Sequence, residues 1–216
     1  LPTTLDPGEA YDFAAWEVLS HLYTGLTRQV PGTLNYEPAL AEAITASDDG
    51  LTYTVTLRQG AAFSDGTPIT AQTFVDAIAR TRSLRRGAAQ AIEPYVESVA
   101  VDDEGRLVFT LTRPTPYFAA LLALPPYFPQ HPSLAATDEP QPFPDTLIGN
   151  GPYMLKSFAV RDEIVLVADS GYTLGPAPRT PRIVLRHFTR SQDLRDATRN
   201  RTVDLAWRAL FMGDLL

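Results

Sequence analysis

The stretch Leu51-Thr52-Tyr53-Thr54-Val55-Thr56-Leu57-Arg58 decides the fold class of this 216-residue chain. Apolar side chains alternate strictly with threonine and arginine, so one face of the segment is apolar and the other is polar. Such alternation is typical of a half-buried strand in an antiparallel sheet. We therefore expect antiparallel neighbours and burial of the four apolar side chains, which are Leu51, Tyr53, Val55 and Leu57.

The segments on either side of this strand extend the prediction. The turn Ser47-Asp48-Asp49-Gly50 precedes it, and a strand over 42–46 is expected to pair with it as a hairpin. The turn Ser64-Asp65-Gly66-Thr67-Pro68 leads to a helix predicted over 71–83, with Thr70 as its N-cap. The buried face expected for this helix consists of Ala71, Phe74, Val75, Ile78 and Ala79.

The remaining elements complete a mixed α/β (α+β) fold. The segment from 125 to 144 is dense in proline, which predicts a surface loop without helix or strand. Apolar periodicity and turn signals predict helices over 10–22, 117–124 and 191–199, the last capped by Ser191. The same signals predict strands over 26–30, 96–101, 106–111, 153–160, 164–168, 182–188 and 203–206.

Composition excludes several classes of protein. The chain has 25 acidic and 18 basic residues and a formal net charge of −7, which disfavours a general nucleic-acid binder. Seven arginines between 179 and 201 fit a solvated face better than a phosphate-binding patch. No run of 18 apolar residues occurs, so no direct membrane span is expected. The absence of cysteine excludes disulfides, a cysteine nucleophile and thiolate metal sites.

Motifs for catalysis are also missing. Neither a glycine-rich phosphate loop nor a Gly-x-Ser-x-Gly segment occurs. The acidic runs at 48–49, 102–104 and 138–139 fall in predicted turns, where they fit solvated turns better than acid–base pairs. No two of the histidines, His21, His131 and His187, have the spacing of metal ligands on a helix. We assign no catalytic residue, no metal and no cofactor.

Several segments together resemble the family 5 extracellular solute-binding proteins of ABC importers, the peptide- and nickel-binding group. The two Asp-Gly segments, 49–58 and 63–71, follow one another at the family's spacing and carry most of the resemblance. Gln72 and Thr73 replace the usual acidic residue at the helix start, and Asn150 replaces the usual Thr or Ser of a glycine turn. The other matching segments are Leu5-Asp6-Pro7, Leu22-Tyr23-Thr24-Gly25-Leu26, Pro38-Ala39-Leu40-Ala41, Gly149-Asn150-Gly151-Pro152-Tyr153 and Val203-Asp204-Leu205-Ala206.

The resemblance implies a fold and a function. The fold is the N-terminal lobe of a two-lobed, periplasmic-binding-protein type II-like structure, with the C-terminal lobe absent from this chain. Residues 1–37 and 148–216 would form a mixed-sheet lobe, and residues 38–147 a smaller α+β subdomain. The protein would be a monomer that captures a peptide or similar small polar solute between its lobes and delivers it to the permease subunits of an ABC importer. It would work in the periplasm or at the outer face of the cytoplasmic membrane, lipid-anchored when full-length.

The resemblance also implies where ligand contacts lie on this lobe. They would come from the loop after Leu5-Asp6-Pro7, from an aromatic loop near Tyr127, and from the end of the last strand. For each aromatic side chain among them the alternative is core packing. Trp207, Tyr127 and Phe128 in particular are expected on an exposed, cleft-facing surface, with Arg208 partly exposed. The candidate ligand-binding residues are Tyr11, Asp12, Phe13, Tyr127, Phe128, His131, Trp207 and Arg208.

Two other kinds of function remain as alternatives. One is a hydrolase with paired carboxylates, which requires an acidic pair projecting from strand ends into one cleft, whereas the pairs here fall in turns. The other is a stand-alone docking module, which the sequence downstream of Leu216 would distinguish from a lobe of a larger protein.

Overall fold

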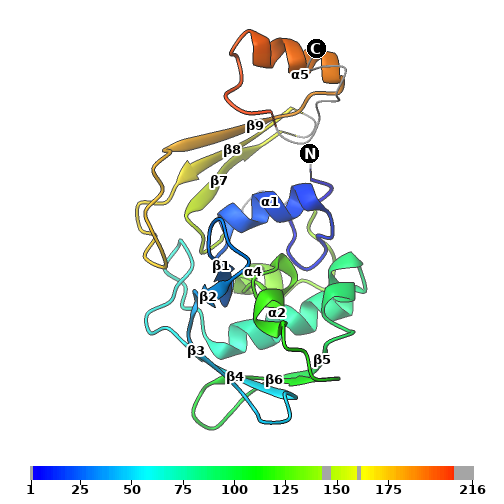
Figure 1. Ribbon diagram of the computed structural model, residues 1–216, viewed down its shortest axis with the longest axis vertical. Coiled ribbons are helices and arrows are strands. Elements are labelled where there is room, and N and C mark those ends of the chain that lie inside the picture. The colour runs from blue at the N-terminus through cyan, green and yellow to red at the C-terminus, as the bar shows by residue number, and fades with distance from the viewer. Residues whose placement is uncertain (1, 143–146, 160–161, 207–216) are drawn as a thin grey trace.

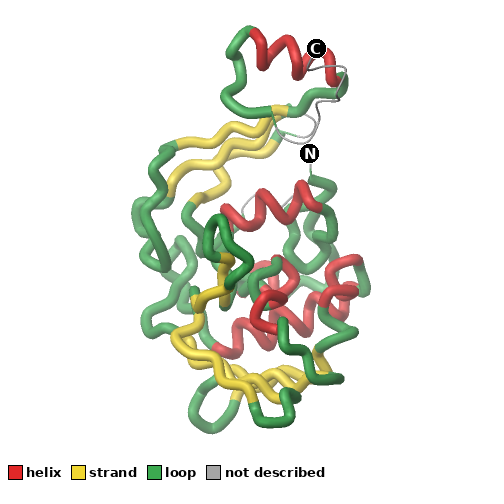
Figure 2. Tube along the Cα trace, viewed as in Figure 1, coloured by secondary structure: helices red, strands yellow, loops and turns green. Residues whose placement is uncertain are grey.

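The computed structural model describes residues 2–142, 147–159 and 162–206. Figure 1 shows a three-stranded sheet and a helix, α5, at one end of the molecule and a four-stranded sheet at the other, with α1 and α2 between the two sheets. Figure 2 shows that all helices except α5 lie between these sheets. Apolar side chains from every one of these layers except α5 join one continuous core, including Leu19, Phe74, Phe109 and Leu166. The mixed α/β class is thus confirmed.

The four-stranded sheet contains the alternating segment 51–58. Its strands are β3 (Ala41–Ala46), β4 (Thr52–Leu57), β5 (Val96–Val101) and β6 (Leu107–Leu111), in the order β3-β4-β6-β5. Both predicted hairpins are confirmed, and every pair in this sheet is antiparallel. Tyr53 and Val55 are buried, but Leu51 and Leu57 are only half-buried, so the expectation of full burial is wrong at the two ends of the strand. End positions have fewer neighbours, because the strands of a twisted sheet diverge there.

Helix α2 (Ala71–Leu84) covers one face of this sheet by packing on β5 and β6. Phe74 and Ile78 are buried in the same core cluster as the apolar side chains of β4, as predicted. Val75 is only half-buried and Ala79 is exposed, so the predicted buried face is wrong at these two positions. Thr70 is the N-cap, and its backbone N–H donates to the Thr73 hydroxyl at 3.1 Å. Thr73 therefore makes the contact that an acidic side chain makes in a capping box.

The three-stranded sheet follows later in the chain. It consists of β7 (Tyr153–Phe158), β8 (Glu163–Ala168) and β9 (Arg182–Arg186), paired antiparallel in that order. The strand predicted over 203–206 is wrong: these residues are irregular and Leu205 is 78% exposed. A short alternating segment becomes a strand only beside a free edge that can pair with it, and none pairs with 203–206 among the described residues. A mixed sheet was expected for this part, whereas all described strand pairs are antiparallel.

Helix α1 (Phe13–Leu22) packs between the two larger sheets and contacts β7. It begins three residues later than predicted, because Asp12 caps it by accepting a hydrogen bond from the Ala15 N–H at 2.9 Å. Helix α5 (Ser191–Arg199) has Arg190 as its N-cap, without a side-chain capping bond, so the predicted Ser191 cap is wrong. The small sheet pairs β1 (Thr27–Gln29) with β2 (Tyr36–Pro38).

The proline-rich segment is not wholly irregular, which corrects the sequence prediction. It begins with a 3₁₀ turn, η2 (Pro125–Tyr127), and continues into a short helix, α4 (Pro132–Ala135). Both start on proline, which suits the first turn of a helix because no N–H is needed there. The two other short elements are η1 (Gly87–Ala91) and α3 (Phe118–Leu121).

The turn Gly149-Asn150-Gly151-Pro152 attaches the three-stranded sheet to α1. The Asn150 side chain accepts from the Thr24 N–H at 3.1 Å and donates to the Thr24 carbonyl at 3.0 Å. The Gly151 N–H donates to the Leu22 carbonyl at 2.9 Å. A Cβ at Gly149 or Gly151 would come within 2.0 Å or 2.4 Å of the Leu22 backbone. The motif therefore permits a close approach between two backbones, which only glycine allows.

Candidate functional site

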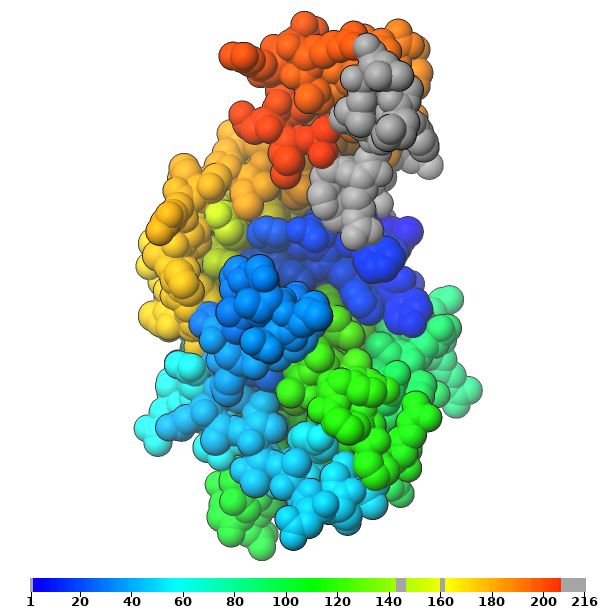
Figure 3. Space-filling view, viewed as in Figure 1, coloured from blue at the N-terminus to red at the C-terminus, as the bar shows by residue number. Residues whose placement is uncertain are grey.

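The N-terminal loop, defined here as residues 6–12, leads into α1 and carries the exposed part of the candidate site. Tyr11 is 50% exposed, and Phe13, the first residue of α1, is 68% exposed. Asp12 lies between them, half-buried, with one carboxylate oxygen on the Ala15 N–H and the other 2.6 Å from the Thr3 hydroxyl. The structure thus brings Tyr11, Asp12 and Phe13 together. In Figure 3 this N-terminal surface, in blue, lies between the surfaces of the later and the middle parts of the chain.

Trp16 belongs to the same surface and was not among the predicted site residues. Its ring meets that of Tyr11 edge-on with centroids 5.7 Å apart, and its indole N–H donates to the Ala10 carbonyl at 2.9 Å. A shallow hollow of about 130 Å³ adjoins it, between α1 and the start of η2. This hollow is lined by Phe13, Trp16, Glu17, Ser20, Ala123, Leu124 and Pro125.

Tyr127 and Phe128 do not belong to this surface, so the expectation that they are exposed is wrong. Tyr127 is completely buried and Phe128 is 2% exposed. The Tyr127 hydroxyl donates to the Ala91 carbonyl at 2.8 Å, and burial raises the pKa of this hydroxyl above its ordinary value. Phe128 stacks on Tyr23 with ring centroids 5.9 Å apart. The start of the proline-rich segment, which was predicted to be a surface loop, instead forms the turn η2, and both rings lie in the core.

His131 lies apart from the N-terminal loop, in a polar cluster of its own. Its Nε2 lies 3.2 Å from both the Asp65 carboxylate and the Thr67 hydroxyl, and its Nδ1 lies 2.7 Å from the Ser133 hydroxyl. A backbone N–H bond from Thr67, followed by further contacts that include His131, holds the pKa of Asp65 below its ordinary value. With only 13% of its side chain exposed, His131 fastens the Asp65 turn to α4.

Two candidates, Trp207 and Arg208, lie outside the described residues. Within the described ranges, no three His, Asp or Glu side chains gather in a way that would hold a metal ion. Nor does any helix in the described part of the chain combine the length and apolar character that crossing a membrane requires. The assembled surface offers aromatic faces and the carboxylates of Asp12 and Glu17, which suit the binding of a ligand through stacking and polar contacts.

Sequence reasoning missed the polar group that fixes the N-terminal loop. Asp6 and Arg80 form a buried ion pair with Arg80 Nη2 and Asp6 Oδ2 2.7 Å apart, and their side chains are 0% and 2% exposed. The pKa of the nearby Tyr23 hydroxyl is raised, first by burial and then by the Asp6 charge, against an opposing effect of Arg80. A weak signal existed, because Arg80 lies beside the apolar stripe of α2, where an arginine needs a partner.

The sequence model of the bacterial extracellular solute-binding proteins, family 5 (middle region), matches residues 35–211. The chain belongs to this family. The resemblance inferred from the two Asp-Gly segments is therefore confirmed, and the family is one of binding proteins rather than enzymes.

Individual relatives agree with the family match. The chain is 32% identical to the dipeptide-binding protein DppE of Bacillus subtilis, over 79% of this chain and 34% of that protein. It is 31% identical to the probable D,D-dipeptide-binding periplasmic protein DdpA of Escherichia coli, over 95% of this chain and 41% of that protein. The chain therefore spans about a third to two fifths of the length of these relatives.

Solved structures confirm the fold. The periplasmic oligopeptide-binding protein OppAIV of Borrelia burgdorferi superposes with a TM-score of 0.85 at 24% identity. The match covers 94% of this chain and 44% of that structure. The lobe architecture of the solute-binding fold, expected from the sequence, is thus present.

Proposed function

We propose that this chain is the N-terminal part of the extracellular solute-binding component of an ABC importer, and that the whole protein captures peptides. The observation that carries the proposal is the family match over residues 35–211, together with two relatives that are named for dipeptides. The protein would hold its ligand between two lobes, pass it to the permease subunits and catalyse no reaction. Closure of two domains around a ligand is a common mechanism of such capture.

We propose further that the N-terminal loop forms part of the ligand-binding wall of this lobe. Tyr11 and Phe13 present aromatic faces, which stack on peptide groups and side chains, and Asp12 offers a partly satisfied carboxylate. Trp207 and Arg208 remain in the proposed site. Tyr127 and Phe128 would support this lobe from its core without touching ligand, because both are buried.

Location and assembly follow from the same proposal. The protein would act as a monomer in the periplasm or at the outer face of the cytoplasmic membrane, with a lipid anchor in its full-length form. The division into a lobe from 1–37 and 148–216 and a subdomain from 38–147 also remains a prediction. It is supported by the separate sheets of the two parts, β7–β9 and β3–β6.

Binding by the full-length protein tests the function. Native mass spectrometry of the protein as purified, followed by calorimetry with Ala-Ala, Ala-Ala-Ala and a mixed tetrapeptide pool, should detect one peptide per protein. The matched variants are Tyr11→Ala and Tyr36→Ala, because both tyrosines are exposed but only Tyr11 lies in the N-terminal loop. We expect Tyr11→Ala to bind peptide more weakly than wild type and Tyr36→Ala to bind it with unchanged affinity. Absence of peptide binding together with hydrolysis of a peptide would favour the hydrolase alternative.

A further inference from the structure

The N-terminal loop, residues 6–12, is fixed at both of its ends. At the far end, Asp12 caps α1 and the indole of Trp16 binds the Ala10 carbonyl. Tyr11 packs so closely on the 3₁₀ turn η1 that a Cβ at Gly87 would lie 2.5 Å from the Tyr11 Cβ. The loop is therefore held against α1 on one side and against η1 on the other.

The near end of the loop is fixed by Asp6, because each of its two carboxylate oxygens accepts two hydrogen bonds. One oxygen accepts from the Gly8 N–H at 2.9 Å and from Arg80 Nη1 at 2.8 Å. The other accepts from Arg80 Nη2 at 2.7 Å and from the Gln141 N–H at 2.8 Å. The Asp6 backbone carbonyl accepts from the next two N–H groups of the loop, those of Glu9 and Ala10. Asp6 thus sets the backbone path of the whole turn.

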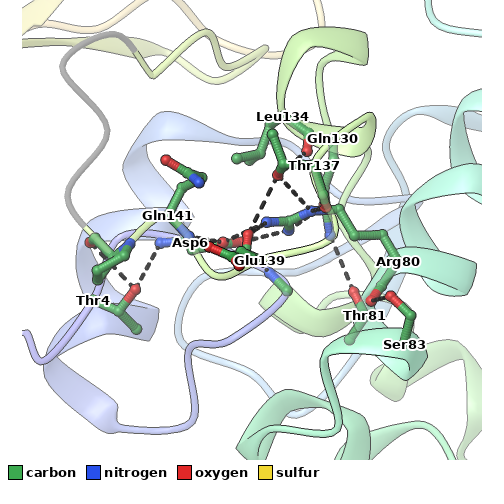
Figure 4. A network of polar contacts seen from close by, with 12 residues as sticks. Thr4, Asp6, Arg80, Thr81, Ser83, Gln130, Leu134, Thr137, Glu139 and Gln141 are labelled. Atoms are coloured by element: carbon green, nitrogen blue, oxygen red, sulfur yellow. Dashed lines mark hydrogen bonds and ion pairs between the residues drawn. The ribbon is translucent and has the colours of Figure 1, made fainter.

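Arg80 in α2 is the centre of this network, which Figure 4 shows from close by. All five of its N–H donors have an acceptor. Besides the two bonds to Asp6, Nε donates to the Thr137 carbonyl at 2.9 Å, Nη1 to Gln130 Oε1 at 2.9 Å and Nη2 to the Glu139 carbonyl at 3.1 Å. Its guanidinium also closes over the loop, since a Cβ at Gly8 would lie 2.7 Å from Nη1.

The burial of this pair makes the loop conformation costly to leave. Asp6 is fully buried and Arg80 nearly so, and a buried charge that loses its partner is strongly unfavourable. The loop cannot move away from α2 unless both charges lose their partner. Arg80 itself is too deep to touch a ligand, so any influence it has on binding must pass through the loop.

We propose that Arg80 is a positioning residue that preorganises the N-terminal loop, so that Tyr11 and Phe13 are held ready for ligand; this rests on the proposed function of the loop as a ligand-binding wall. A loop that is already ordered loses little conformational entropy when ligand binds. Release of the loop would add the ordering of two aromatic side chains to the cost of binding. We expect affinity to fall by roughly 10-fold when the pair is removed.

Hydrogen exchange in the full-length protein tests the positioning directly, without any ligand. Three variants are compared: Arg80→Met, the neutral double variant Asp6→Asn with Arg80→Met, and Arg80→Lys. The double variant leaves no unpaired buried charge and so keeps the fold where the single variant loses it. The lysine retains the charge but cannot make the paired contacts of a guanidinium. In the variants that fold, the amides of residues 8–10 should exchange at least about 10-fold faster than they do in wild type, with the amides of β4 as the internal reference.

Two controls separate positioning from general destabilisation. Ile78→Ala removes a buried side chain from the same helix without touching the network, so it lowers stability but should leave the loop amides unchanged relative to β4. Arg106→Met removes a half-buried arginine far from the network, which pairs with Asp102 and Glu104. It should leave the exchange of the loop amides unchanged. Wild-type exchange of residues 8–10 in the folded double variant and in Arg80→Lys would overturn the proposal.

Calorimetry with Ala-Ala and Ala-Ala-Ala supplies the second measurement. If wild type binds a peptide, the double variant should bind it roughly 10-fold more weakly, whereas Ile78→Ala should bind it with unchanged affinity. Equal weakening by Ile78→Ala would show that Arg80 acts only through stability and would overturn the proposal. If wild type binds neither peptide, the proposed function fails for these ligands, while the exchange experiment still decides whether Arg80 positions the loop.

Discussion

Replacement of Gly151 by alanine should destabilise the chain by roughly 2–4 kcal/mol, for reasons that lie in the contact between two backbones. A Cβ at this position would lie 2.4 Å from the Leu22 carbonyl carbon, 2.5 Å from the Tyr23 nitrogen and 2.6 Å from the His21 carbonyl oxygen. These are backbone atoms at the end of α1, and they cannot rotate away as a side chain does. Gly151 does not have a positive φ, so alanine can adopt its backbone conformation and the cost is steric.

The magnitude follows from the hydrogen bonds that the displacement would break. A shift of about 1 Å is needed to restore ordinary van der Waals contact. That shift would break the bond from the Gly151 N–H to the Leu22 carbonyl and the two bonds between Asn150 and Thr24. Each intramolecular bond contributes about 0.5–1.5 kcal/mol, so the loss of all three amounts to roughly 2–4 kcal/mol.

Urea unfolding followed by far-UV circular dichroism measures this difference, and Gly171→Ala is the matched control. Gly171 also lacks a positive φ. Among the described residues other than its two chain neighbours, only the Asp169 carboxylate oxygen lies within 4 Å of its added Cβ, at 3.3 Å, and this side chain can move. We expect the control to cost less than about 1 kcal/mol. A Gly151→Ala variant as stable as the control would refute the argument that this turn requires glycine for close approach.

Four further outcomes are expected. Tyr127→Phe should lower the unfolding free energy by about 1–2 kcal/mol in urea titrations, because it leaves a buried backbone carbonyl without its donor. Asn150→Ala should cost about 1–3 kcal/mol in the same assay, whereas Asn150→Asp should cost more because its carboxylate faces the Thr24 carbonyl. The Thr67 N–H lowers the pKa of Asp65, so the ionised carboxylate stabilises the fold above the ordinary pKa of 3.8. This stabilisation is lost as the pH falls through the lower pKa of the folded state. The melting temperature of Asp65→Asn should therefore depend less on pH in acid than that of wild type. The 216-residue chain alone should bind no peptide with sub-micromolar affinity in calorimetry, since half of a clamp leaves half of the ligand in water.

The elements that the sequence predicted well have long, regular patterns with one buried face. Strand β4 and helix α2 follow their predicted ranges within a residue or so, because strict alternation and helical spacing each distinguish one mainly apolar face from the rest. The segment 203–206 has a similar pattern but is irregular. Four residues specify a strand only when a neighbouring edge is available, and the local sequence does not contain that information.

The site was harder to predict because residue type does not determine exposure. Tyr11 and Tyr127 are both aromatic and both lie near prolines or turns, yet one is half exposed and the other completely buried. The difference in exposure depends on how η2 is oriented relative to the preceding helix α3. This orientation is set by tertiary packing and not by the local sequence. Proline density predicts a surface loop, whereas Pro125 and Pro126 are buried at the start of the turn that contains Tyr127.

The Asp6–Arg80 pair shows a second limit. The two residues lie 74 positions apart, and 17 other basic residues were available to pair with Asp6. The Leu5-Asp6-Pro7 segment was recognised as part of the family pattern, but its physical role became visible only when α2 was placed beside it. Long-range pairing of charges depends on the tertiary fold and cannot be derived from local spacing.

The N-terminal segment is held from two directions by independent contacts. The Arg80 network fixes residues 6–10 to α2, and the glycine turn fixes Leu22 and Thr24 to the start of β7. Helix α1 lies between these two attachments and shares one core with both sheets. A motion that separated the two sheets would have to break the buried ion pair or the close backbone contact. Breaking the pair is strongly unfavourable, because it leaves two buried charges without partners. We therefore expect α1, α2 and the two larger sheets to move as one unit when the proposed clamp closes.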